Sequence, residues 1–304
     1  MLIIRVKNTF STHPWLTLLA IAWLLLVLLA GNTQLFTLLS DFGAFLFLGV
    51  IGAIFANATG AGGGVVFVPF FQQLAFTPET VVATSFAIQC CGMSAGALSW
   101  GQFYRHTQRQ QANWQPLPGT LKYSIPMGLC GLWLAQFGFD YFLATLSFSA
   151  LASQLHIGFG VFSMGLAVAI LLSLKRLNQR HCQTVLGQID KFALPMLAFI
   201  GGILTAYLSV GIGEIIAVYL IVRRFDVTLA IGAAVIISAC TVWGGVLHGL
   251  LVTQAVNWQV VLFAGAGAVI GGRIARYLVL FFSPRQVKLF FALWVFVLGL
   301  ISLL

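Results

Sequence analysis

Charged residues are scarce in this sequence. They make up 7% of its 304 residues, against about 25% in an ordinary soluble domain. This composition excludes a water-soluble globular protein, which depends on surface charge for its solubility. The 15 Lys and Arg residues stand in small groups between apolar runs and form no basic domain with interleaved aromatic residues, so we expect no nucleic acid partner.

Motifs that would hold a metal, a nucleotide or a disulfide framework are also missing. The five cysteines are an odd number without metal-ligand spacing. Neither H-E-x-x-H nor a Walker-type sequence occurs, so we expect no metal site, no cofactor and no ATP-driven step. No A-x-A-like cleavage site follows the apolar run after Arg5 and Lys7, so we interpret that run as a transmembrane helix and not as a signal peptide.

Long apolar runs dominate the chain instead. The AVILMFWYC set accounts for 60% of the residues, and a helical run of about 20 apolar residues crosses a bilayer. The fold class predicted is therefore an all-α polytopic membrane protein. Two apolar regions, 42–78 and 192–222, are interrupted by glycine. Seven continuous runs predict full transmembrane helices at 14–31, 80–100, 121–139, 157–174, 229–252, 258–278 and 286–304.

The basic residues indicate how these segments are oriented. If each interrupted region is a helical hairpin that enters and leaves on the same side, all 15 Lys and Arg residues fall on one face of the membrane. Asp41, Glu79 and Asp140 then fall on the other face. The positive-inside rule makes the basic face cytoplasmic, with the N-terminus inside and the C-terminus outside the cell (inner) membrane.

This layout predicts an inverted-topology repeat within a single integral membrane domain, residues 1–304. Residues 14–139 would form the first repeat, residues 157–278 the second, and residues 286–304 an extra C-terminal helix. Identity between the halves is sparse: a shift of 151 residues places Gly60 over Gly211, whereas a shift of 149 places Cys91 over Cys240. The predicted repeat therefore depends on element order and charge placement.

The first interruption is Gly60-Ala61-Gly62-Gly63-Gly64, with four glycines in five residues. Glycine tolerates non-helical dihedrals, so we expect the helix to break here and to restart at Val65. The restarting helix would offer free N–H groups and the positive end of its dipole to a small anionic substrate. Neutral polar side chains on either side complete the candidate substrate site: Asn57, Thr59, Thr84, Ser85 and Gln89.

The second interruption, Ser209 to Glu214, lies at the matching place in the other half and adds Gly211 and Gly213 to the candidate site. Paired glycine-interrupted segments are typical of the midplane site of a secondary transporter. The alternative is that these glycines only allow helices to pack closely.

Glu214 is the only acidic residue deep inside an apolar region. Because an intramembrane carboxylate is usually functional, one interpretation is a group that couples transport to protons. The other is a cap on a helix that restarts at Ile215. His248 is a second candidate for proton transfer, although a histidine near a helix end is also typical of a membrane interface.

Gly92-Met93-Ser94-Ala95-Gly96 matches the G-x-S-x-G motif, so an intramembrane serine protease using Ser94, with His248 as its partner, is an alternative. That motif requires a strand-to-helix turn, whereas Ser94 lies in an apolar run where the same residues form a GxxxG packing face. We therefore expect no enzyme.

The segment from Ala58 to Pro69, followed by Val82-Ala83-Thr84-Ser85, resembles the first repeat of the sulfite exporter TauE/SafE family. The shared features are a G-x-G-G-G segment, a Val-Pro pair and an Ala-Thr-Ser element. The resemblance implies an inner-membrane secondary transporter of sulfite, organosulfonates or similar sulfur oxyanions, without a cofactor. Its site would involve Gly60, Gly62, Gly63, Gly64, Pro69, Thr84 and Ser85, with Gly211, Gly213 and the helix near Ala233 as second-repeat counterparts.

The second half departs from this family pattern. Glu214-Ile215 stand where the family usually has further glycines, and Ala233-Ala234 replace the Thr-Ser element. We expect a secondary transporter that moves a small anion through a lipid bilayer, with a proton handled by Glu214. A membrane protein that binds an anion without moving it is the alternative.

Overall fold

The computed structural model describes residues 35–74, 76–138 and 182–301, with a few positions between 157 and 171. Two expected crossings, 14–31 and 157–174, lie wholly or largely outside the described residues. The elements of the described chain are all helices. They are α3 (Leu35–Phe42), α4 (Ala44–Thr59), α5 (Gly64–Gln73), α6 (Pro78–Phe103), η1 (Tyr104–Gln108), η2 (Ala112–Trp114), α7 (Pro116–Trp133), η3 (Leu134–Gly138), α10 (Gln188–Leu208), α11 (Ile212–Val222), α12 (Val227–Leu251), α13 (Trp258–Phe281) and α14 (Pro284–Ile301).

Five described helices are long and apolar enough to cross a membrane, judged by length and composition: Thr37–Thr59, Pro78–Gln108, Gln188–Leu208, Val227–Leu251 and Trp258–Phe281. Three of them coincide with predicted crossings, and the prediction of an all-helical polytopic membrane protein is confirmed. The other two are the first arms of the interrupted regions. These first arms have 23 and 21 residues, whereas the return arms α5 and α11 have 10 and 11.

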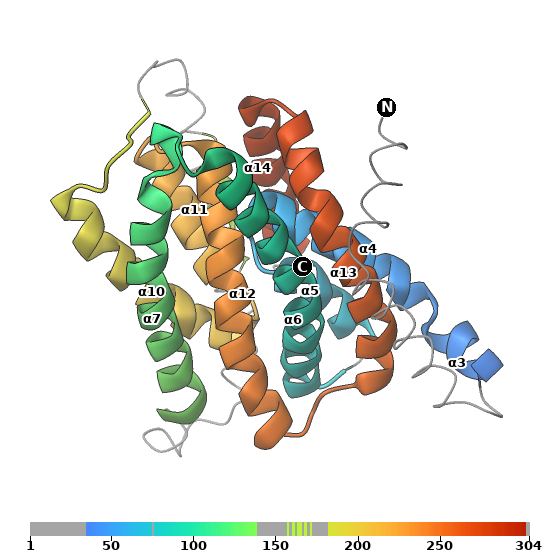
Figure 1. The fold of residues 1–304 in the computed structure, drawn as a ribbon. Helices are drawn as coiled ribbons and strands as arrows, with labels where there is room; N and C mark the ends of the chain where they lie inside the picture. The colour runs from blue at the N-terminus through green and yellow to red at the C-terminus, as the bar shows by residue number, and fades with distance from the viewer. Residues whose placement is uncertain are drawn as a thin grey trace.

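The centre of the molecule is an antiparallel pair, α6 and α12 (Figure 1). Gly232, near the start of α12, packs against the ring of Trp100, near the end of α6. Gly249, near the end of α12, packs against Ala83, near the start of α6. The two central helices therefore run in opposite directions.

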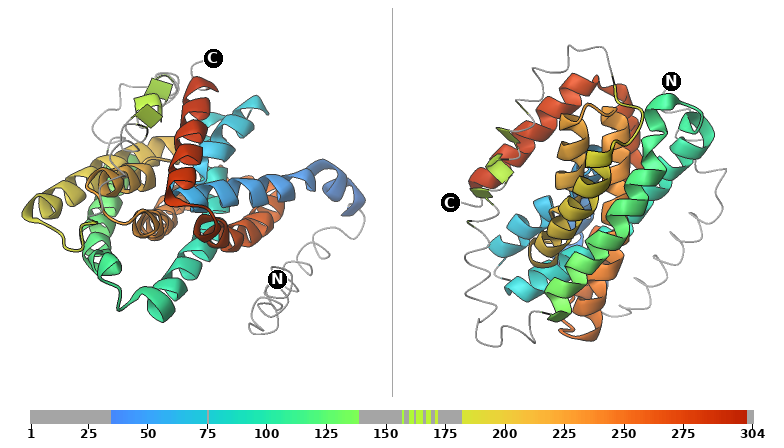
Figure 2. Two further views of the ribbon diagram at one scale, coloured as in Figure 1. Left: turned by 90° about the horizontal axis from the view of Figure 1, so that it is seen from above. Right: turned by 90° about the vertical axis from the view of Figure 1, so that its left-hand side faces the viewer.

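A parallel pair of helices flanks each side of this centre. Gly267 and Gly271 of α13 lie against the backbone of α4 at Leu46 and Val50, and on the other side α7 packs along α10 (Figure 2). Small residues at these contacts let the helix backbones approach closely, which is how helices associate in a bilayer.

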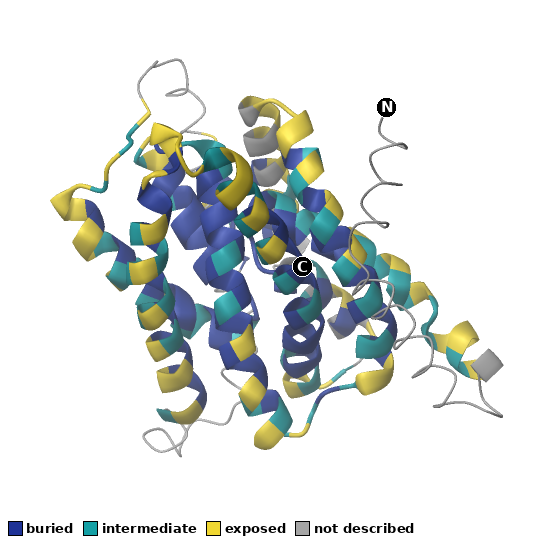
Figure 3. Cartoon of the chain, in the orientation of Figure 1, coloured by how far each residue is buried: buried dark blue, intermediate teal, exposed yellow. Residues whose placement is uncertain are grey.

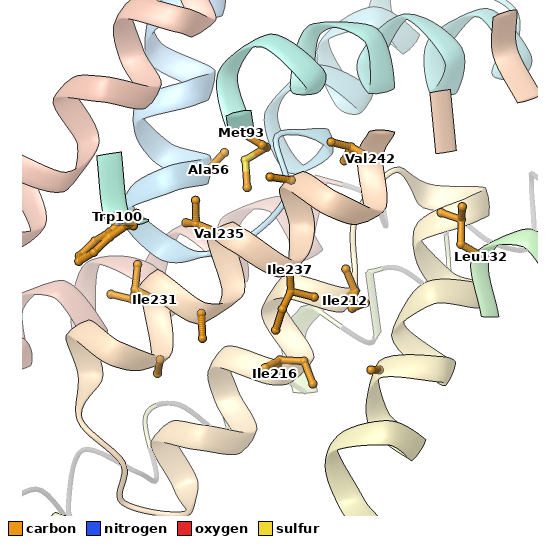
Figure 4. Packing of buried hydrophobic residues seen from close by; sticks show 14 of the residues in the cluster. Ala56, Met93, Trp100, Leu132, Ile212, Ile216, Ile231, Val235, Ile237 and Val242 are labelled. Atoms are coloured by element: carbon orange, nitrogen blue, oxygen red, sulfur yellow. The ribbon is translucent and has the colours of Figure 1, made fainter. Parts of the chain in front are cut away.

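Burial follows the same arrangement. In the most apolar 18-residue stretch of α12, 83% of the residues are buried, against 17% in the corresponding stretch of Thr37–Thr59. The helix α12 is therefore a core element and α4 an outer one (Figure 3). Ile212 and Ile216 of α11 pack with Ile237 of α12, and all three are fully buried (Figure 4). Outward-facing apolar residues such as Phe192, which is 80% exposed, are suited to contact with lipid.

The local signals that start and stop these helices recur at a constant spacing. α4 and α10 both end in a left-handed residue, Gly60 (φ 79°) and Ser209 (φ 57°). α6 and α12 both begin after a side-chain cap, Thr77 and Asp226. The members of each pair are 149 residues apart, so one shift relates the two broken hairpins. The expected shift of 151 residues at the breaks, which aligns Gly60 with Gly211, is therefore wrong. The helix ends give a shift of 149 residues, which aligns Gly62 with Gly211.

Candidate functional site

Both interrupted regions contain a true break in the helix. The first break separates α4 from α5, which restarts at Gly64, one residue before the expected Val65. The second separates α10 from α11, where Gly211 adopts φ 143°, a conformation that favours glycine. α11 restarts at Ile212 and not at the expected Ile215, because Glu214 caps the helix from its third position and not from the position before it.

The two breaks lie against each other. A Cβ added at Gly64 would overlap the carbonyl group of Ser209, and a Cβ added at Gly213 would overlap the carbonyl oxygen of Gly60. These contacts are reciprocal, because the 149-residue shift that relates Gly60 to Ser209 also relates Gly64 to Gly213. We call this place, formed by residues 60–64 and 209–213 with the side chains that touch them, the crossing site.

Side chains from α6 hold the second break in place. The Gln89 Nε2 group donates to Ser209 Oγ at 2.7 Å, to the Ser209 carbonyl oxygen at 3.2 Å and to Ser85 Oγ at 3.0 Å. Ser209 Oγ in turn donates to Ser85 Oγ at 3.1 Å. All three side chains are buried. A polar network of this kind inside an apolar core fixes one arrangement of the groups that it joins.

The two restarting helices differ in how their first N–H groups are satisfied. At α11, the N–H of Gly211 donates to Glu214 Oε2 at 2.8 Å and the N–H of Ile212 to Thr205 Oγ1 at 3.0 Å. At α5, the N–H groups of Gly63 and Gly64 donate to no acceptor among the described residues. The positive end of a helix dipole is therefore open to an anion at the first break and closed at the second.

Three buried polar atoms at the crossing site have no hydrogen-bond partner within the described chain: Gln89 Oε1, Glu214 Oε1 and Ser238 Oγ. Gln89 Oε1 lies beside Gly62, and Ser238 Oγ beside Gly213. Buried polar groups are nearly always paired, so several unpaired atoms in one place indicate a site that acts on a polar or charged ligand.

Three predicted site residues lie elsewhere. The Thr84 hydroxyl accepts from the N–H of Asn257 at 3.0 Å, at the start of α13. The Asn57 amide donates to the carbonyl oxygens of Ala53 and Gly92, away from the breaks. His248 packs edge-on against Phe137, with ring centroids 5.3 Å apart. It follows Ser238 by ten residues on α12, which is about 15 Å along the helix.

Thr59 has a local role. Its hydroxyl donates to the Phe55 carbonyl oxygen at 2.7 Å and accepts from the N–H of Ala61 at 3.2 Å, so it helps to end α4 and holds the backbone at the edge of the crossing site. Ser85, Gln89 and the predicted glycines of both breaks are brought together, together with the backbone of Val65 in the first turn of α5.

Two serines of the crossing site were absent from the predicted site, Ser209 and Ser238. The signal that identifies them is the 149-residue shift, because it places Ser209 over Gly60 and Ser238 over Gln89. A shift of 151 residues aligns neither of these pairs.

The geometry gives the serine protease interpretation no support. Ser94 lies inside α6 and not at a strand-to-helix turn. Its hydroxyl accepts from the indole Nε1 of Trp243 at 2.8 Å. Within the described chain this is its only side-chain hydrogen bond, and a nucleophilic serine is activated by a neighbouring base.

We predict that Gln89→Leu weakens anion binding strongly. The substitution removes the donor that joins Ser85 to Ser209 and leaves the buried Ser209 carbonyl oxygen without that donor, at a cost of about 1–3 kcal/mol. Gln136→Leu is a matched control, because Gln136 is also a buried amide that donates to one backbone carbonyl, of Gly245, at 3.0 Å. Both variants should lose thermal stability, but only Gln89→Leu should lose anion binding by calorimetry. Equal binding by the two variants would contradict the assignment of the site.

Comparison with known proteins agrees with this architecture. No curated protein and no solved structure matched the chain. A sequence profile of the family described as sulfite exporter TauE/SafE matches residues 45–301, which include both broken hairpins, all of the crossing site and α14. The chain therefore belongs to the sulfite exporter TauE/SafE family.

Proposed function

We propose that this membrane transporter carries sulfite, an organosulfonate or a closely related small oxyanion by secondary transport. The observation that supports this proposal most directly is the N-terminus of α5, where the N–H groups of Gly63 and Gly64 have no acceptor in the described part of the chain and lie within a buried polar site. Backbone N–H groups at a helix N-terminus bind oxyanions without any charged side chain. The family name supplies the sulfur chemistry.

The chemistry of the crossing site favours an anion that is readily released. The side chains there are neutral apart from Glu214, and no Lys or Arg of the described chain belongs to it. A site made from amide and hydroxyl donors stabilises a partly dehydrated oxyanion without the tight pairing that a guanidinium gives. Moderate affinity suits a carrier, which must release its substrate on the far side.

Transport would proceed by movement of one half of the chain against the other. The two breaks are in direct backbone contact, because Gly64 lies against the carbonyl group of Ser209 and Gly213 against that of Gly60. A polyatomic anion that enters the crossing site must therefore move the two breaks apart. The common 149-residue register, the antiparallel α6 and α12 and the two outer parallel pairs support an inverted repeat. In such repeats, rocking of one unit against the other alternates access to a central site.

The proposed orientation places the basic end of the molecule in the cytoplasm. Arg223, at the end of α11, pairs with Asp190, near the start of α10, at 2.8 Å. This ion pair supports entry and exit of the second hairpin at one side. Arg276 of α13 donates to the Ser99 carbonyl oxygen near the end of α6. This end of α6 packs against the start of α12, which follows Arg223, so both arginines lie toward one end of the molecule. The positive-inside rule then places the N-terminus inside and the C-terminus outside.

Glu214 is the proposed proton-coupling group. It is 3% exposed, and its only close hydrogen bond within the described residues comes from the N–H of Gly211. A carboxyl group in such a position gains or loses a proton as the cavity around it dries or wets during transport. His248, at the end of α12, would not take part in the same step.

Uptake by proteoliposomes tests the proposed function. Vesicles loaded with unlabelled sulfite should take up labelled sulfite against its gradient, and an inward proton gradient should raise the accumulation until a protonophore collapses it. Exchange without any effect of the proton gradient would contradict coupling. Binding without exchange would contradict transport and favour the alternative, a protein that binds an anion without moving it.

A further inference from the structure

We infer that the Glu214 carboxylate is a built-in competitor of the transported anion, so that the anion binds tightly only when this carboxylate is neutralised. The inference rests on the proposed function and concerns how the crossing site is regulated. It assigns Glu214 a repulsive role toward the substrate, in addition to the exchange of a proton.

The position of the carboxyl group carries this inference. Glu214 Oε2 accepts from the N–H of Gly211 at 2.8 Å. When it is ionised, this carboxylate therefore occupies the place at the second break where an anion would otherwise bind. The N–H of Gly62, in the first break, interacts with the same carboxyl group at a looser geometry than a hydrogen bond. The carboxyl group therefore reaches across the contact between the breaks, toward the donors that remain open at Gly63 and Gly64.

An anion at the first break would lie next to this carboxylate. Two like charges at close range in a poorly solvated site repel strongly, because the energy scales inversely with both distance and effective dielectric constant. Among the described residues no basic side chain lies beside Glu214: on the helices packed against α11, Asp190, Lys191, Asp226 and His248 lie near helix ends, and Arg223 follows the end of α11. The other titratable groups on α6, α10, α11 and α12 near the site are neutral. They are the free thiols of Cys90, Cys91 and Cys240 and the phenols of Tyr207 and Tyr219, which donate to the Ala135 carbonyl oxygen and to Asp190.

The three unpaired atoms are consistent with a site that changes its protonation. While the carboxylate is ionised, Glu214 Oε1 and Gln89 Oε1 are both acceptors, and neither has a donor in the described chain. Protonation of Glu214 turns one of its oxygens into a donor and weakens its attraction for the N–H of Gly62. Anion and proton then bind as a pair that adds no net charge to the membrane interior.

Binding of ethanesulfonate to the purified protein tests the inference, because this probe keeps one negative charge at every pH used. By calorimetry, the wild-type dissociation constant should be at least about tenfold smaller at pH 5.5 than at pH 8.5. Glu214→Gln, which keeps the size and a capping oxygen but removes the charge, should bind at pH 8.5 as tightly as the wild type does at pH 5.5. Glu214→Met should show the same gain without the capping oxygen.

Asp190→Asn provides the control. It neutralises the other buried carboxylate, which is outside the crossing site, so it should keep the wild-type dependence on pH. Equal affinities for all variants at both pH values would refute the competition and leave the transporter proposal standing. Weaker binding by Glu214→Gln would also refute it, because the charge of Glu214 would then favour anion binding, as it would if it held a cation that accompanies the anion. If ethanesulfonate and sulfite bind to no variant at either pH, the proposed function itself fails.

Discussion

Gly64→Ala should eliminate nearly all sulfite exchange by proteoliposomes. The added Cβ would overlap the carbonyl carbon and oxygen of Ser209, which are backbone atoms that cannot rotate away. Relieving the overlap forces the two breaks apart and should cost about 1–3 kcal/mol of stability. It also displaces the free N–H groups that the anion needs. Exchange of labelled sulfite and thermal unfolding of the same preparation measure the two effects separately.

Two other glycines provide a graded control. A Cβ at Gly63 would meet side-chain atoms of Gln89 and Phe67 at 2.8 and 2.9 Å, which are able to shift, so Gly63→Ala should be milder. A Cβ at Gly101, in α6, would meet no atom within 4 Å, so Gly101→Ala should be neutral. Loss of exchange in the order Gly64, Gly63, Gly101 is expected. Equal exchange by Gly64→Ala and Gly101→Ala would mean that the breaks do not need to touch for transport.

Asp190→Ala should destabilise the folded protein by about 3 kcal/mol, the lower end of the range for a broken buried ion pair, because the Arg223 side chain is 31% exposed. The fully buried Asp190 carboxylate accepts from Arg223 Nε at 2.8 Å, from the Tyr219 hydroxyl at 2.6 Å and from the N–H of Gly187 at 2.8 Å. Its removal leaves all these donors without their acceptor and loosens the ends of the second hairpin. Thermal unfolding measures the loss.

Asp226→Ala is the matched control for this prediction. The Asp226 carboxylate accepts from the N–H groups of Thr228 and Leu229 at the start of α12, and has no basic partner among the ion pairs of the described chain. Loss of such a cap costs about 1 kcal/mol. A melting temperature that falls less for Asp190→Ala than for Asp226→Ala would contradict the role of Asp190 in holding α10 to α11.

The sequence predicted the breaks well because their cause is local. Glycine runs and an αL residue end a helix whatever surrounds them, so the interruptions at Gly60 and near Gly211 were predictable. The restart of α11 was predicted three residues too late, because Glu214 was read as the residue before the helix. The lengths of the arms were harder to predict, since α10 packs against α7, a helix far away in the sequence, and no local pattern contains that contact.

Membership of the crossing site depended on contacts between the halves. Thr84 and Ser85 are adjacent in sequence, but they point in directions about 100° apart on a helix, so only one of them faces the breaks. Ser85 reaches Ser209, whereas Thr84 reaches Asn257. Ser209 and Ser238 carry no motif of their own, and only the 149-residue register marks them. A carboxyl group in an apolar run was conspicuous, so Glu214 was found from the sequence alone.

The ion pair between Asp190 and Arg223 makes the two hairpins mechanically unequal. In the second hairpin Asp190 pairs with Arg223, whereas the equivalent positions in the first are Asp41 and Leu74, which cannot pair. Any movement that separates the ends of α10 and α11 must therefore break this ion pair, whereas Asp41 and Leu74 offer no such bond in the first hairpin. The conformational equilibrium of the empty carrier should consequently be biased toward the state in which the Asp190–Arg223 pair is formed.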